Sequence, residues 1–598
     1  MVTLFAAGTG YGAGATSLAT ATTNASGDFN LPSYTCPVGN PQTYITASGG
    51  DAGSGTNSAI ALMAALGPCN SLSTSTHITV NELTTAAAQW ALAQFFDSTG
   101  HTMGAPSSNA GGLRNAYTGF ANLAGLNGSN FSVSGNPSTF LPTGGSCPGP
   151  SNCDGLERLN TLANIMAGCI ESSGSSSSAC VKLMCDATPG LTYTTSCSGT
   201  PTISDTMGAA HLIVTNPANN VSALFGLAAV STPFSPVLGA APDGWEIALN
   251  FAPAGAAFSL PQSIALDASG NVFVANSNGN HGPDLGSVSE LTVASGYAAG
   301  LNLAPAGAVF DEPTSLALDG SGDVFVANGG TNGDFGSVSE LTVGSSYATG
   351  LNFAPTGTFR FPISIALDTS GNVFMANATG DNVSELTAAS GYTTGLKFAP
   401  PGASFDFPQS LALDGSGNVF VANTDGDSVS ELTAGSSYAT GLNFAASGAS
   451  FNAPASIALD GTSNVFVGNE GGNSMSELTA ASSYATGLEF ASAGASLNEP
   501  VSIALDGAGN VFAANANGES VSELTAASSY GTGLNFAPAG AGFSVPSSIA
   551  VDGAGNVFVA DRVGDSVSEI LGLAQPVITP VQSCLTFWSN HPGLTCVP

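Results

Sequence analysis

The second half of the chain repeats one pattern of apolar and polar positions. It first reads SIALDASGNVFVAN over 263–276, an apolar segment, a turn and a second apolar segment. An aspartate ends the first segment in every copy. These aspartates are Asp267, Asp319, Asp368, Asp414, Asp460, Asp506 and Asp552. Their spacings are 52, 49, 46, 46, 46 and 46, which indicates seven copies of a 46-residue unit.

Each unit contains four segments typical of β-strands. In the fourth copy they cover Ser410–Asp414, Asn418–Asn423, Ser428–Thr433 and Tyr438–Phe444. Asp and Gly fill the turns between the first three, since Asp caps turns and Gly adopts positive φ. The second segment, Val-Phe-Val-Ala, is apolar on both faces and must lie between neighbouring sheets. Seven such four-stranded sheets predict a seven-bladed β-propeller over 245–571.

The pattern also predicts how the ring closes. The seventh copy ends near Leu571 after only three strands, and Trp245–Phe251 ahead of the first copy matches a fourth strand. We therefore expect 245–251 to supply the outer strand of the last blade, which leaves no long open edge.

The first half has a different character. We expect a small β-domain fragment over 1–50, a disulfide-containing helical domain over 51–235, and a C-terminal tail over 572–598. Helix formers or apolar residues at helical spacing predict helices at Asn81–Leu92, Leu156–Ile170, Met207–Val214 and Val221–Val230. The overall fold prediction is mainly β, with the propeller preceded by these two smaller parts.

Ten cysteines lie outside the repeats. Eight precede residue 200: Cys36, Cys69, Cys147, Cys153, Cys169, Cys180, Cys185 and Cys197. No C-x-x-C occurs, which argues against zinc or thioredoxin-like chemistry and favours disulfides in an oxidising compartment. We expect Cys584 and Cys596 to pair with each other and close the tail.

Charge excludes several functions. Asp and Glu number 40 against 6 Lys and Arg, a formal net charge of −34. Such a chain is repelled by nucleic acid and by anionic membranes. No run of about 18 apolar residues predicts membrane insertion. We expect a secreted or extracytoplasmic protein, with its signal peptide missing from the given chain and encoded upstream of Met1.

The repeated phrase Pro-x-Ser-[Ile/Leu]-Ala-Leu-Asp-Gly-x-Gly-Asn-Val-Phe-Val-Ala-Asn resembles the NHL repeat, over about 245–571. The resemblance implies a propeller and a role as an interaction module, a lyase or a surface protein. The family's strand-ending Asp is Asn in six copies, and Asp561 is the exception. Ser-Val-Ser-Glu replaces the usual Asn-x-Arg, which removes the basic face that some NHL modules use for RNA.

Residues 1–50 resemble a fragment of a transthyretin-like, carboxypeptidase-regulatory domain. The resemblance rests on Val2–Phe5, Thr22–Phe29 and Thr43–Thr46. It implies a strand ahead of Val2, which agrees with a start inside a longer precursor.

Enzyme motifs are absent from the sequence. It has no P-loop, no H-E-x-x-H and no G-x-S-x-G elbow. Propeller lyases that resemble NHL proteins need several His or Glu around a central metal, and only His281 falls in the propeller. We expect the repeated aspartates to cap turns. A second sevenfold set is expected to be solvated or hydrogen-bonded, with cation binding as the alternative: Glu290, Glu340, Glu385, Glu431, Glu477, Glu523 and Glu569.

Two enlarged loops depart from the repeat and indicate a candidate ligand-binding site. The loop between the second and third strands is longer by six residues in the first copy and by four in the second. It emerges on the same side as the connection from the fourth strand to the next blade, and such insertions often mark a binding face. The candidate ligand-binding residues are Asn278, His281, Asp284, Asp311, Glu312, Asn332 and Asp334. Their oxygens suit a polyhydroxyl ligand or a cation; no cofactor is expected, with calcium left open.

The functional hypothesis is a secreted or surface-displayed propeller that binds a protein or glycan without catalysis. One alternative is a propeller lyase or hydrolase with a metal in the central channel. The other is a purely structural or adhesive surface protein.

Overall fold

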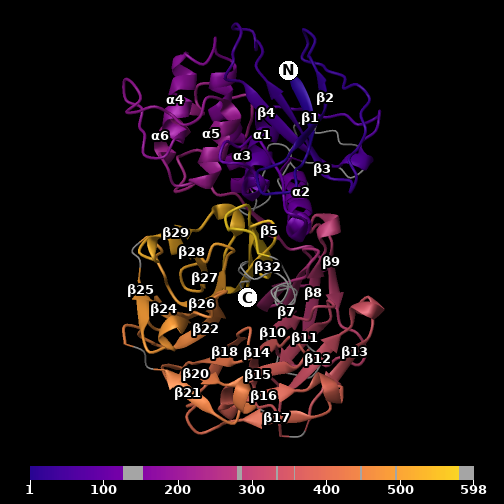
Figure 1. The fold of residues 1–598 in the computed structure, drawn as a ribbon, viewed down its shortest axis with the longest axis vertical. Helices are drawn as coiled ribbons and strands as arrows, with labels where there is room; N and C mark the ends of the chain where they lie inside the picture. The colour runs from indigo at the N-terminus through magenta and orange to yellow at the C-terminus, as the bar shows by residue number, and fades with distance from the viewer. Residues whose placement is uncertain are drawn as a thin grey trace.

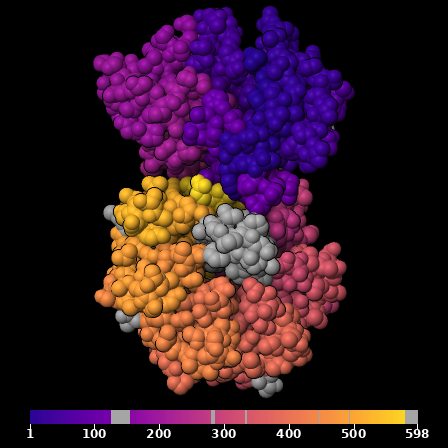
Figure 2. Space-filling model, in the orientation of Figure 1, coloured from indigo at the N-terminus to yellow at the C-terminus, as the bar shows by residue number. Residues whose placement is uncertain are grey.

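The computed structural model describes residues 1–124, 153–278, 286–330, 335–355, 357–444, 447–491 and 494–577. Figure 1 shows two lobes, an N-terminal one of sheet and helices and a larger ring of β-sheets. In Figure 2 the N-terminal lobe sits directly on one side of the ring.

One antiparallel sheet forms the centre of the N-terminal lobe. Its strand order is β2-β1-β3-β4, and the strands are β1 Val2–Ala6, β2 Thr16–Ala21, β3 Gln42–Ser48 and β4 Ala61–Pro68. The sheet extends past the boundary expected at residue 50, because β4 pairs with β3 along its length. The Ala- and Leu-rich composition of β4 carries no strand signal of its own, and burial of Met63 and Ala64 against the sheet decides its conformation.

Among the described residues of this lobe, six α-helices accompany the sheet: α1 Glu82–Ala91, α2 Ala110–Ala124, α3 Cys153–Ile170, α4 Ser178–Ala187, α5 Thr206–Thr215 and α6 Val221–Leu227. Three 3-10 turns accompany them, η1 Cys69–Ser71, η2 Ala93–Phe95 and η3 Ser107–Asn109. The four expected helices are α1, α3, α5 and α6. The unexpected α2 is rich in glycine because it packs against the ring: a Cβ on Gly112 would lie 1.9 Å from the Gly553 carbonyl oxygen.

Three disulfides staple the described part of the lobe, as the cysteine pattern predicts. They join Cys36 to Cys69, Cys169 to Cys180 and Cys185 to Cys197. The first ties the segment before β3 to the end of β4, and the second ties the end of α3 to α4. The predicted pair Cys584–Cys596 lies outside the described residues.

Seven four-stranded antiparallel sheets form the ring, which confirms the predicted propeller. Blades are numbered along the chain, with strands listed from the axis outward. Blade 1 is β6 Pro261–Leu266, β7 Val272–Asn276, β8 Ser287–Leu291 and β9 Gly300–Leu303. Blade 2 is β10 Pro313–Leu318, β11 Val324–Asn328, β12 Ser337–Leu341 and β13 Gly350–Phe353. Blade 3 is β14 Pro362–Leu367, β15 Val373–Asn377, β16 Asn382–Leu386 and β17 Gly395–Phe398.

Blade 4 is β18 Pro408–Leu413, β19 Val419–Asn423, β20 Ser428–Leu432 and β21 Gly441–Phe444. Blade 5 is β22 Pro454–Leu459, β23 Val465–Asn469, β24 Ser474–Leu478 and β25 Gly487–Phe490. Blade 6 is β26 Pro500–Leu505, β27 Val511–Asn515, β28 Ser520–Leu524 and β29 Gly533–Phe536. Blade 7 is β30 Pro546–Val551, β31 Val557–Asp561, β32 Ser566–Ile570 and β5 Ala248–Phe251.

Aromatic pairs hold neighbouring blades together. The Phe of each second strand is buried, and in six of the seven blades it meets a Tyr that belongs to the following blade. In blade 4, Phe420 meets Tyr484 edge to face with ring centroids 5.2 Å apart. The equivalent pairs are Phe273–Tyr347, Phe325–Tyr392, Phe374–Tyr438, Phe466–Tyr530 and Phe558–Tyr297.

The tyrosines also explain why the fourth strands start later than expected. Tyr438 has φ of +60° and its hydroxyl donates to the Gly417 carbonyl oxygen at 3.1 Å, so strand β21 begins only at Gly441. A short 3-10 turn precedes each such Tyr: η4 Val293–Ser295, η6 Val343–Ser345, η8 Ala388–Ser390, η9 Ala434–Ser436, η10 Ala480–Ser482 and η11 Ala526–Ser528. Two further turns, η7 Ala378–Gly380 and η12 Ala539–Ala541, lie in other connections.

Strand β5 closes the ring, as the sequence predicts. It pairs with β32 from Val567↔Phe251 to Ile570↔Ala248. The Asn250 amide donates to the Ser566 hydroxyl at 2.8 Å, which fixes the pairing further. The first strand after the N-terminal lobe is therefore the last strand of the propeller.

The two lobes are joined by hydrogen bonds as well as by the chain. The Trp90 indole donates to the Trp245 carbonyl oxygen at 3.0 Å, just ahead of β5. Asn109 donates to the Gly553 carbonyl oxygen at 2.8 Å, in the turn between β30 and β31. Gln94 donates to the Gly572 carbonyl oxygen at 2.8 Å, just after β32. The lobe thus packs on blade 7, where the ring closes.

Replacing Phe420 with Ala is expected to destabilise the protein by about 3–5 kcal/mol, because it opens a cavity between two blades. Leu442→Ala is the control in the same blade, since the Leu442 side chain is 50% exposed. It should change the free energy of unfolding by less than about 0.5 kcal/mol. Denaturant unfolding measures both, and equal losses would contradict the packing between blades.

Candidate functional site

The long loops of blades 1 and 2 flank one short segment, Phe310–Glu312, which leads into blade 2. The Gly286 amide, at the end of the first loop, donates to the Phe310 carbonyl oxygen at 3.1 Å. In the second loop, Gly329 donates to the Glu312 carbonyl oxygen at 2.9 Å and Gly330 to that of Asp311 at 3.1 Å. Both loops therefore emerge beside this connection, on one face of the ring, here called the loop face.

Three of the seven candidate residues can be placed. Asn278 is partly buried and bonded to Ser259, whose hydroxyl donates to the Asn278 side chain at 3.1 Å. Asp311 and Glu312 are partly buried in the next connection. The structure puts these residues on the same face, in adjacent blades. His281, Asp284, Asn332 and Asp334 lie outside the described residues.

The backbone at Glu312 is strained in a way that recurs around the ring. Its φ is +53°, a left-handed conformation that non-glycine residues adopt at a cost. The residue before the first-strand proline has positive φ in every blade: Leu260, Glu312, Phe361, Phe407, Ala453, Glu499 and Val545. In blade 5 the Ala453 amide donates to Asp427 of blade 4 at 2.7 Å, so this conformation joins neighbouring blades. The strain is structural and is not particular to the candidate site.

The repeated aspartates cap turns, as expected. Asp414 Oδ1 accepts the Ser416 amide at 2.9 Å and the Asn418 amide at 2.8 Å, while Oδ2 accepts the Asn418 side chain at 2.9 Å. Asn418 Oδ1 in turn accepts the Ala434 amide at 2.9 Å. The Asp–Asn pair therefore fastens the first turn of the blade to the turn after its third strand. The face that carries these turns is here called the turn face.

The sevenfold glutamates are buried, so the solvated alternative is corrected, while the hydrogen-bonded alternative holds for Glu569, whose carboxylate accepts the Asn556 side-chain amide at 2.7 Å. Their exposed fractions are only 1–9%. Each glutamate is buried because it lies on the third strand, opposite the buried Phe of the second strand, as Glu431 lies opposite Phe420. Burial raises their pKa values, to about 7 for Glu340 and Glu523, and the neighbouring turn aspartates add to the rise. The alternation of Ser-Val-Ser-Glu in the sequence predicts a strand with one solvent-exposed face. The packing of neighbouring blades buries that face instead.

Blade 7 holds the most perturbed carboxyls. Burial raises the pKa of Asp552 to about 7 and that of Asp561 to about 8. Glu569 is 1% exposed and its pKa is raised well above the ordinary value, by burial first and by Asp552 second. Perturbed carboxyls often mark active sites. Asp552 lies in the turn whose Gly553 carbonyl oxygen accepts the Asn109 amide of the N-terminal lobe, and Asn556 of the same turn donates to Glu569, so these two carboxyls belong to the joint between the lobes. Asp561 lies at the other end of β31 and accepts the Ser568 hydroxyl within its own blade.

Metal ligands do not gather in the described part of the chain. No three His, Cys, Asp or Glu side chains there are placed to hold one ion. Within the same residues, no helix is long and apolar enough to cross a membrane.

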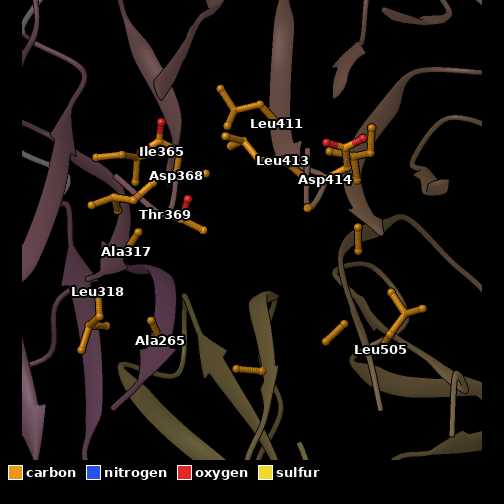
Figure 3. Close-up of a pocket in the computed structure, with 18 of the residues that line it drawn as sticks. Ala265, Ala317, Leu318, Ile365, Asp368, Thr369, Leu411, Leu413, Asp414 and Leu505 are labelled. Carbon is orange, nitrogen blue, oxygen red and sulfur yellow. The ribbon is translucent and has the colours of Figure 1, made fainter. Parts of the chain in front are cut away.

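The sequence does not predict the cavity that lies on the ring axis. It has a volume of about 580 Å³ and is lined by the first strands of all seven blades (Figure 3). The sequence signal is the small Ala between two large apolar residues in each first strand, as in Leu316-Ala317-Leu318. That pattern also fits a fully buried strand, so it does not by itself indicate a hollow.

No family model matches the chain, and neither does any curated protein. An inactive virginiamycin B lyase from Staphylococcus aureus, crystallised with quinupristin, shares 13% identity at a TM-score of 0.44, over 55% of this chain and 99% of its own. Hydrazine synthase from Kuenenia stuttgartiensis shares 13% at 0.40, over 53% and 97%. The extracellular domain of a one-component system from B. thetaiotaomicron shares 13% at 0.41, over 55% and 42%. These resemblances concern the propeller fold.

One turn breaks the Asp–Asn rule. Blade 2 has Asp323 where the other blades have Asn, so two carboxylates, Asp319 and Asp323, occupy the positions at which five other blades form a hydrogen bond between the Asn amide and the Asp carboxylate. Asp323 still accepts the Val343 amide at 2.7 Å. Burial raises the pKa of Asp323, and the charge of Asp319 raises it further.

Asp323→Asn is expected to stabilise the protein by about 0.5–1.5 kcal/mol at pH 7, since it restores the missing hydrogen bond. The folded-state pKa of Asp323 is raised, so wild type loses stability as pH rises from the ordinary carboxyl range through that raised value. The gain should therefore be larger at pH 7 than at pH 3.5, as denaturant unfolding would show. Asn418→Asp in blade 4 should have the opposite effect; a gain there would contradict the explanation.

Proposed function

We propose that this chain is an extracytoplasmic NHL-type propeller that binds a polyhydroxyl ligand, such as a glycan, on its loop face and does not transform it. The observation that carries the proposal is the position of Phe310–Glu312, bonded through its backbone to both enlarged loops. The binding residues are Asn278, His281, Asp284, Asp311, Glu312, Asn332 and Asp334.

The chemistry of these residues supports a ligand rich in hydroxyl groups. Carboxylate and amide oxygens accept hydrogen bonds from hydroxyls, and amide nitrogens donate to them. A histidine adds a group that titrates near neutrality. Calcium could bridge a diol to the carboxylates, since its ligands are oxygens.

The architecture supports a binding role for this face. Loops carry function best when a rigid scaffold positions them. The interlocked blades form such a scaffold. Helix α2 and the preceding turn η3 dock on the turn face, where Gly112 and Asn109 meet Gly553, so that contact leaves the loop face of blades 1 and 2 to a ligand.

An extracytoplasmic location is supported by the three disulfides of the N-terminal lobe, because reducing compartments do not maintain structural disulfides. The NHL resemblance supports a binding role through the propeller it implies.

The test is a glycan array with the full chain, followed by titration of any glycan found. The Asp311→Asn/Glu312→Gln variant should weaken binding at least about tenfold, as expected when charge-assisted hydrogen bonds of about 1.5–3 kcal/mol are lost. Glu499→Gln is the matched control, because Glu499 has the same φ and precedes Pro500 in a blade with a short loop. It should bind as wild type does.

Trimming both long loops to the blade 4 length should abolish binding and leave the fold intact, since shortening changes closure entropy by less than about 1 kcal/mol. Binding that vanishes with EDTA would show that calcium takes part. A trimmed protein that binds unchanged would place the ligand elsewhere. An array with no glycan hit would overturn the glycan proposal in favour of a protein partner or a structural role.

A further inference from the structure

The cavity on the ring axis has the size and walls of a small-molecule site. At about 580 Å³ it falls within the range of known ligand pockets, about 300–1,000 Å³. Every blade contributes Ile or Leu and Ala from its first strand, so apolar side chains line the wall all round. Figure 3 shows Ala317, Leu411 and Leu505 around the open centre, from three different blades.

The walls are apolar, but one part of the rim is acidic. The first turns of blades 3 and 4 reach the cavity with Asp368, Thr369, Ser370, Asp414 and Ser416, and the turn after the third strand of blade 4 adds Ala434 and Tyr438. Val577, held by its amide to the Asp552 carbonyl oxygen at 3.0 Å, adds an apolar contact from the segment after blade 7. The cavity thus has a polar, anionic side and an apolar remainder.

The carboxylate of Asp414 on this rim can accept a further partner. The turn uses Asp414 Oδ1 for two backbone amides and Oδ2 for one side-chain amide. A carboxylate offers about four acceptor positions, so Asp414 keeps capacity toward the cavity. A positively charged donor matches it best, because charge-assisted hydrogen bonds are about twice as strong as neutral ones.

The negative charge of the whole ring also favours a positively charged ligand. Residues 245–571 contain 30 acidic and only three basic side chains, Arg360, Lys397 and Arg562. None of the described residues that line the cavity is Lys, Arg or His. A cleft lined by one sign of charge with low-dielectric walls concentrates ions of the opposite sign. Anionic ligands are repelled from the axis.

We propose that the axial cavity binds an organic ammonium ion with an apolar body, its ammonium group at Asp414 and its hydrocarbon against the Ile, Leu and Ala walls. This site differs from the glycan site of the loop face. It lies on the axis at the turn face and takes a small cation in place of a polyhydroxyl ligand.

The probes are octylammonium, octanol and octanoate, titrated calorimetrically into the full chain. Octylammonium should bind with one-to-one stoichiometry and at least about tenfold more tightly than octanol, while octanoate should not bind. Affinity should rise about fourfold per methylene from hexyl- to octylammonium, as for burial of a hydrocarbon chain. Equal binding of octanol or octanoate would overturn the proposal.

Two variants locate the site. Ala317→Leu fills the cavity and should reduce octylammonium affinity at least tenfold, whereas Ala348→Leu, at an exposed position of the same blade, should not. Asp414→Asn preserves the turn cap through its side-chain oxygen and should weaken octylammonium about fivefold without changing octanol binding. Asp460→Asn is its control, since the equivalent turn of blade 5 does not line the cavity.

Equal effects of Asp414→Asn and Asp460→Asn would show nonspecific attraction to the acidic surface and overturn the assignment. Octylammonium binding that is unchanged in both Ala317→Leu and Asp414→Asn would also overturn the assignment. The Asp311→Asn/Glu312→Gln variant should bind octylammonium as wild type does, so failure of the loop-face proposal is distinguishable from failure of this one.

Discussion

The pairing of β5 with β32 is the constraint on which the rest of the structure depends. Six blades are complete within their own repeats, but blade 7 obtains its outer strand from residues that precede the first repeat. The same chain segment emerges from the N-terminal lobe, where Trp90 holds the Trp245 carbonyl oxygen. One strand therefore closes the ring and fixes the lobe on blade 7.

Closure matters because each blade is stable only between two neighbours. The second strands are buried on both faces, and their Phe rings meet the Tyr of the following blade. At the last interface Phe558 meets Tyr297 of blade 1, so the ring ends on the same contact with which it begins. Blade 7 lacks this Tyr, and Phe512 of blade 6 packs instead near Ala574 and Val577 of the segment after β32. That segment thus seals the one irregular interface and borders the cavity.

Repetition made the propeller predictable from sequence, including the swap of 245–251 into blade 7, because turn residues and a doubly apolar strand recur at one spacing. What the sequence could not show depends on contacts between distant segments. Glu431 lies in a strand whose polar and apolar residues alternate, as in a strand with one solvent-exposed face, yet the packing of blades buries it. Gly112 reads as a helix breaker, but its missing side chain lets α2 reach Gly553. The loop-face residues were found from loop lengths, whereas the cavity needs all seven first strands in place.

Ring closure is tested most directly by a cysteine pair at Asn250→Cys/Ser568→Cys, two positions that face each other in the β5–β32 register. The control pair is Asn250→Cys/Ser522→Cys, in which Ser522 occupies the equivalent position of blade 6. Peptide mapping without reduction should find a disulfide between residues 250 and 568 in the folded protein and none between 250 and 522. A bond between 250 and 522, or a folded protein in which 250 and 568 remain unlinked, would contradict the closed seven-bladed ring.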